Sequence, residues 1–188
     1  MRIAVLAWGS LWWNPGTLNK ASDFAPNGPL VPIEFCRISA DRRLTLVVNE
    51  DFGDMCTTYS ALSGNQNLEA AIENLGLREE SRPAEIGFVD LAAGKQSRAA
   101  LKRHPQVVAT IEAWVESAGY DAAIWTALAS NFEEGAGELF SVTAALRYLE
   151  MLERKDATAF TNALDYIRSA PPEVQTTVRD GVARRWPG

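Results

Sequence analysis

Histidine is nearly absent from this sequence, since its 188 residues contain only one, His104. A Cys2His2 zinc site, a three-histidine metal centre and a relay of several histidines are therefore excluded. If the protein is an enzyme, its chemistry must depend mainly on carboxylates, backbone amides, hydroxyls or thiols.

Cysteine is also scarce. Cys36 and Cys56 stand twenty residues apart, without C-x-x-C spacing and without the cysteine density of a small secreted domain. Each lies in a run typical of a β-strand, so we expect both thiols to be buried and reduced.

Long apolar runs and an excess of positive charge are missing as well. Ile3–Trp8 is too short for a signal-peptide core, and no run approaches the ~18 apolar residues of a membrane span. The net charge of −6 argues against a broad nucleic-acid-binding surface. Apolar residues make up 47% and charged residues 22%, which is typical of globular proteins. We expect a soluble, cytoplasmic protein with neither a membrane nor a nucleic acid as partner.

The first two-thirds of the chain are rich in predicted strands. Ile3–Trp8 is a continuous apolar run, as expected of a strand buried on both faces. Apolar residues alternate in three further predicted strands, Val31–Ser39, Arg43–Val48 and Glu85–Leu91, and a short turn predicts a hairpin between the first two of these. Cys56–Leu62 and Ala122–Leu128 are also predicted as strands.

Helical periodicity appears in five segments. One helix begins after Asn67 as N-cap and ends at Gly76, and a second covers residues 105–117. From Ser141 onward the apolar period is 3.6, which predicts three further helices, with Asp156 as an N-cap: Val142–Arg154, Ala157–Arg168 and Pro172–Trp186. We expect an α+β fold with a core at residues 1–130 and a helical extension at 131–188, packed together as a single domain.

The segment Trp8–Gly16 is the first candidate for chemistry. Gly9 lets the backbone turn at the end of a buried strand, and successive amides in such a turn can bind an anion such as a carboxylate. Ser10 adds a hydroxyl group. The alternative is an ordinary tight turn in which Trp12 and Trp13 serve packing.

The segment Arg78-Glu79-Glu80 is the second candidate. A general base needs a carboxylate that is held near the substrate and partly desolvated, and Glu79 follows a helix directed toward the strands. The alternative is an exposed acidic pair with arginines beside it, which would contribute little.

Together these segments resemble the γ-glutamylcyclotransferase-like family, nearest its ChaC-type branch. Trp8–Gly16 is similar to the family's Tyr-Gly-Ser-Leu…Trp-Asn-Pro-Gly signature, with Trp8 at the tyrosine position. Leu75–Glu80 is similar to its Leu-Asp-x-Arg-Glu-Lys segment, whose glutamate is the catalytic base. The resemblance covers about residues 1–92.

The resemblance implies a small mixed β-barrel core and intramolecular aminolysis of a small γ-glutamyl amide, which gives 5-oxoproline and a free amine. It implies that Gly9, Ser10 and Leu11, together with Trp8, bind the glutamyl end, and that Glu79 is the base. Trp12 and Trp13 would line the pocket. The substrate supplies its own nucleophile, so neither a metal nor a cofactor is expected.

A second hypothesis stays open. The chain is then a binding or protein-interaction protein that retains the fold without catalysis. The position of Glu79 discriminates between the two, because a base must lie beside the Gly9–Leu11 amides and away from bulk solvent.

Overall fold

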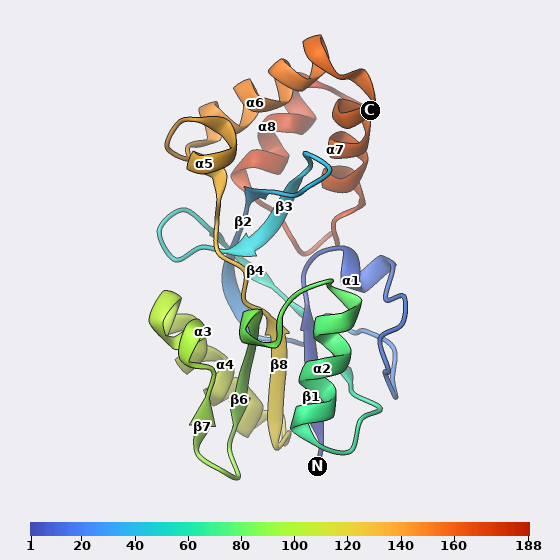
Figure 1. Ribbon diagram of the computed structural model, residues 1–188, viewed down its shortest axis with the longest axis vertical. Coiled ribbons are helices and arrows are strands. Elements are labelled where there is room, and N and C mark those ends of the chain that lie inside the picture. Colours follow the sequence, from blue (N-terminus) through green and yellow to red (C-terminus); the bar gives the residue numbers. More distant parts are fainter. The chain divides into compact units, whose positions relative to one another are not determined.

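Two β-sheets and eight α-helices make up the structure of residues 1–188, a computed structural model (Figure 1). The α+β class is confirmed. Contacts divide the chain into two compact units, each built from two separate segments: Met1–Val31 with Thr57–Leu128, and Pro32–Cys56 with Ala129–Gly188.

The first unit contains a five-stranded sheet in the order β5-β1-β8-β6-β7. Strand β1 lies between β5 and β8 and is buried at every position, which confirms the expected fully buried strand. It is parallel to β8 and antiparallel to β5. The strands are β1 Ile3–Ala7, β5 Tyr59–Leu62, β6 Ile86–Asp90, β7 Lys95–Gln96 and β8 Ala122–Thr126.

Helices of the first unit cover the apolar faces of this sheet. Leu75 of α2 belongs to the same buried cluster as Val5, Ile86 and Ile124 of the sheet. The helix α4 buries Val108, Ile111 and Val115 and contacts β8 and β6. The helices are α1 Ser10–Trp13, α2 Leu68–Arg78, α3 Arg98–Arg103 and α4 Pro105–Ser117, with a 3₁₀ turn η1 at Pro83–Glu85.

The second unit joins a three-stranded sheet, β3-β2-β4, to the C-terminal helices. The expected hairpin is confirmed, with Phe35 of β2 opposite Leu46 of β3 in an antiparallel pair. The helix α7 packs on β3, and Tyr166 meets the ring of Phe35 edge to face at 6.3 Å. The elements are β2 Leu30–Ile38, β3 Leu44–Val48, β4 Asp54–Thr57, α5 Phe132–Ala136, α6 Val142–Lys155, α7 Ala157–Ser169 and α8 Thr177–Arg185.

Two expected N-caps are confirmed. The side chain of Asn67 accepts a hydrogen bond from the Ala70 amide at 2.9 Å, and that of Asp156 accepts one from the Ala159 amide at 3.0 Å. These contacts satisfy first-turn N–H groups that the helices themselves leave unpaired.

Three expected boundaries are wrong. Gly76 does not end its helix, because α2 continues to Arg78. The last helix begins at Thr177 instead of Pro172, since the Thr176 side chain caps it by accepting from the Arg179 amide at 3.3 Å. The run Cys56–Leu62 is not one strand, because it is interrupted at Thr58 and its two parts, β4 and β5, belong to different sheets. The amide and the hydroxyl of Thr58 both donate hydrogen bonds to the Pro29 carbonyl, at 3.2 and 2.8 Å.

The strands form two sheets, and no closed barrel is found, so the barrel expected from the resemblance is not confirmed. Both cysteines are free and buried, as expected. No helix has the length and apolar character required to cross a membrane.

Candidate active site

The chain makes a tight turn where β1 ends. Trp8 and Gly9 connect β1 to the single turn of α1, in which the Trp12 amide donates to the Gly9 carbonyl at 3.0 Å and the Asn14 amide to the Ser10 carbonyl at 2.8 Å. The first amides of a helical turn have no intrahelical acceptor, and those of Ser10 and Leu11 have no other acceptor in the chain. The turn therefore provides two unpaired donors next to the Ser10 hydroxyl.

The predicted binding residues differ in what they can offer to a ligand. Trp8 and Leu11 are 3% and 5% exposed, so their side chains belong to the interior and Leu11 can contribute only backbone groups. Gly9 and Ser10 are half-buried and retain accessible atoms.

Trp12 and Trp13 pack against neighbouring rings. The Trp12 ring lies 5.1 Å from that of Tyr59 and meets Trp13 edge to face at 6.4 Å. Trp12 also packs on the buried cluster beneath α2. The packing alternative thus accounts for Trp12, and a role for either ring in a pocket stays a prediction.

At the end of α2, Glu79 and Glu80 lie in different environments. Glu79 is the C-cap, and Glu80 follows in the left-handed region with a φ of +50°. The Glu80 amide donates to the Leu77 carbonyl at 3.3 Å and the Ser81 amide to the Gly76 carbonyl at 2.9 Å, which together form a Schellman motif. The Glu79 side chain is only 18% exposed, whereas Glu80 lies in solvent, so the two do not form an exposed acidic pair.

Arg78 connects the two predicted segments. Its side chain is 14% exposed and pairs through Nη1 with Glu79 Oε1 at 2.8 Å. Its Nε donates to the Pro15 carbonyl at 3.4 Å, and its Nη2 donates to the Asn14 carbonyl. The guanidinium therefore joins the Glu79 carboxylate to the chain that directly follows α1, although no hydrogen bond links Glu79 to Gly9, Ser10 or Leu11.

Arg78 was not among the predicted site residues. The signal available in the sequence was its position beside Glu79, but nothing local indicates that it reaches Asn14 and Pro15. Those contacts join residues 63 and 64 positions apart in the chain.

Burial raises the pKa of the Glu79 carboxyl above its ordinary value of 4.5. The charge and hydrogen bond of Arg78 act in the opposite direction and do not cancel the effect of burial. A partly desolvated carboxylate with a raised pKa, held by a fixed partner, has the properties required of a general base.

No group of three histidine, cysteine, aspartate or glutamate side chains is arranged to hold a metal ion. Comparisons with protein-family models, with curated proteins and with solved structures give no match.

Proposed function

We propose that this protein is a γ-glutamylcyclotransferase-like enzyme that converts a small γ-glutamyl amide to 5-oxoproline and a free amine. One observation carries the proposal. The Glu79 carboxylate, which the sequence suggests as the base, is largely buried and is joined through Arg78 to the chain following the Gly9–Leu11 turn. The proposal includes the small barrel-like core that the resemblance to this family implies.

Glu79 acts as the base in this reaction. Its carboxylate accepts a proton from the substrate's α-amino group, and the amine nitrogen attacks the γ-carbonyl carbon. A new C–N bond closes the five-membered ring, the original amide C–N bond breaks, and the departing nitrogen takes up a proton. No electrons are gained or lost, and a positioned carboxylate contributes roughly 10²–10⁴-fold to such a proton transfer.

The turn after β1 binds the other end of the glutamyl group. The unpaired amides of Ser10 and Leu11, with the Ser10 hydroxyl, donate to the substrate α-carboxylate. Holding the amine and the γ-carbonyl in a ring-closing pose supplies a large part of the rate.

One observation favours the alternative of a binding protein without catalysis. Oxygen Oε1 of Glu79 already has a partner in Arg78, as in an ion pair that stabilises the end of a helix. Activity measurements distinguish the two functions.

The test is to incubate the purified protein with a panel of γ-glutamyl amines, including γ-glutamyl dipeptides, a γ-glutamyl anilide and glutathione, and to quantify 5-oxoproline. We expect Glu79→Gln to lower kcat/KM by at least about 100-fold. Glu80→Gln, which removes the neighbouring exposed charge, is the matched control and should retain activity. The absence of product from the whole panel favours the alternative, and equal activity in Glu79→Gln contradicts the assignment of the base.

The pH profile gives a second test. Because the pKa of Glu79 is raised, the acidic limb of kcat/KM should lie above pH 4.5, with activity increasing as Glu79 loses its proton. If Glu79→Gln retains some activity and its acidic limb keeps the same position, another group is responsible for the limb.

A further inference from the structure

A groove lies on the α2 side of the five-stranded sheet, where α2 leaves the sheet uncovered. The alternation of β6 places Ile86 and Phe88 on the same face, but Ile86 is buried in the cluster beneath α2 whereas Phe88 is partly exposed. Two adjoining hollows of about 550 and 570 Å³ share Pro83, Phe88 and Lys95. Each has the volume of a small-molecule site.

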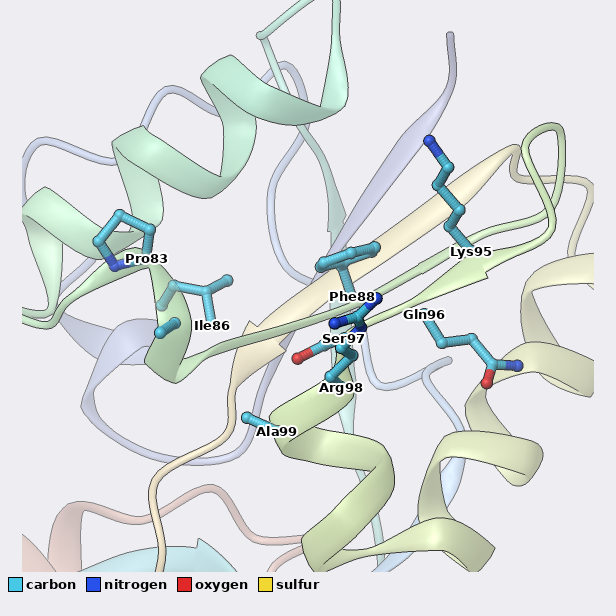
Figure 2. Close-up of a pocket in the computed structure, with 9 residues that line it drawn as sticks. Pro83, Ile86, Phe88, Lys95, Gln96, Ser97, Arg98 and Ala99 are labelled. Carbon is cyan, nitrogen blue, oxygen red and sulfur yellow. The ribbon is translucent and has the colours of Figure 1, made fainter.

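The first hollow, bounded by β7 and α3, combines an apolar floor with positive charge. Figure 2 shows Phe88 near its centre; in this view the Arg98 side chain overlaps Phe88, and Lys95 extends outward from β7. Pro83, Ile86 and Ala99 supply further apolar surface, and no carboxylate lines this hollow. Lys95 and Arg98 are both exposed, and neither forms an ion pair within the chain.

The other polar groups of this hollow are already engaged. The Gln96 side chain donates to Glu112 on α4 at 2.9 Å, and the Ser97 hydroxyl accepts from the Ala100 amide at 3.4 Å. The two cations are therefore the charged groups available to a ligand.

The second hollow has the opposite charge. Glu69 and Glu73 on α2 and Asp90 on β6 line it together with Lys95. An anion is repelled from this half of the groove and attracted to the half that contains Arg98, so the charge distribution fixes the orientation of a bound anion.

We propose that this groove binds a small anionic amphiphile, a carboxylate or sulfonate with an aromatic or alkyl body. The body lies on Phe88 and Ile86, and the anionic group lies between Lys95 and Arg98. Neither Glu79 nor any residue of the Gly9–Leu11 turn lines the groove, so this site is independent of the proposed catalytic function.

The probe is 8-anilinonaphthalene-1-sulfonate, whose fluorescence is followed as it is titrated into the 188-residue protein. We expect the double variant Lys95→Ala/Arg98→Ala to weaken binding at least fivefold and Ala84→Trp, which fills the hollow from an exposed position, to do the same. Lys102→Ala is the matched control, because Lys102 is an exposed cation on the same helix as Arg98 that does not line the groove. It should change affinity less than twofold.

Competition identifies the ligand class. Octanoate should displace the probe, whereas octyltrimethylammonium, which has the same alkyl chain and the opposite charge, should not. Thermal unfolding of each variant shows whether it is folded. Equal probe affinity in wild type, the double variant and Ala84→Trp would overturn the proposal, as would equal displacement by both competitors.

Discussion

Glu80 has a backbone conformation that most residues avoid. It occupies the position after the α2 C-cap, where the Schellman motif requires a left-handed residue, and its φ is +50°. Glycine is the usual residue here because a Cβ atom makes this conformation unfavourable by roughly 1–2 kcal/mol. The strain lies directly beside Glu79, whose position the motif determines.

Replacing Glu80 with glycine should therefore stabilise the protein. The gain is about 0.5–1 kcal/mol, because relief of the left-handed strain exceeds the greater backbone entropy that glycine loses on folding. Urea unfolding measures it as an increase in the midpoint. Glu80→Ala, which removes the carboxylate and keeps the Cβ, is the control, and an equal gain in that variant would show that charge, not backbone strain, is responsible.

Gly87 is needed for a different reason, which is space. A Cβ atom added there would lie 2.3 Å from Cε2 of the Trp125 ring, and both residues belong to paired strands of the same sheet. We expect Gly87→Ala to lower the free energy of unfolding by about 1–3 kcal/mol through overpacking. In a Trp125→Leu background the same change should cost less, because the ring that it meets is absent. An equal loss in both backgrounds would contradict this explanation.

Between elements, a buried carboxylate connects β2 to α8. Glu34 is 0% exposed, and its two oxygens accept hydrogen bonds from the Phe35 amide at 2.7 Å and the Val178 amide at 3.2 Å. The carboxyl group of Asp54 on β4 accepts a hydrogen bond from the neighbouring Thr177 amide at 2.6 Å. Two acidic side chains from the sheet thus accept hydrogen bonds from first-turn amides of α8, which the helix itself leaves unpaired.

Glu34→Gln should destabilise the protein by about 1–3 kcal/mol, because glutamine presents only one acceptor oxygen to the two amides. Burial raises the pKa of Glu34 above 4.5. The protonated group therefore contributes stability that is complete below pH 4.5 and is lost as the pH rises through the raised pKa. The difference in unfolding free energy between wild type and Glu34→Gln should be largest near pH 4 and smaller at pH 8. A difference that grows with pH would contradict the direction of the shift.

Over the whole molecule, each unit is assembled from two separate segments of the chain. The strands β2 and β3 lie before residue 130 but belong to the unit of the C-terminal helices, where Ile33 and Phe35 are fully buried. A division at residue 130 separates these strands from α7, which packs on β3.

Two fragments test this organisation. Residues 1–31 joined by a short glycine-serine linker to 57–128 should unfold cooperatively, because the segment ends are close, with the Thr58 amide 3.2 Å from the Pro29 carbonyl. Residues 1–130 should aggregate or bind the uncharged dye Nile red, which lacks the anionic group proposed for the groove ligand, because β2 and β3 lose the helices that cover them. Circular dichroism, thermal unfolding and dye fluorescence report the outcome. A 1–130 fragment that is equally cooperative and free of dye binding would contradict the assignment of β2 and β3.

Much of the fold could be predicted from short stretches of sequence. The buried strand β1, the β2–β3 hairpin and the caps at Asn67 and Asp156 depend on residues within one strand, turn or helical turn. The end of α2 could not be predicted in the same way, because Glu80 takes a conformation in which glycine is usual. Gly76 is the more obvious signal for a helix end, but α2 continues beyond it to Arg78.

The sequence alone predicted the α+β class, the buried strand β1 and the two candidate segments. It did so because apolar periodicity and capping are local properties of the chain. The burial of Glu79 next to an exposed Glu80 appears only in the folded structure, as does the binding of Arg78 to the carbonyl groups of Asn14 and Pro15. The Arg78 contacts join residues 63 and 64 positions apart in the chain, and the burial of Glu79 depends on what surrounds the end of the helix in the folded chain. Neither can be read from residues that are neighbours in the sequence.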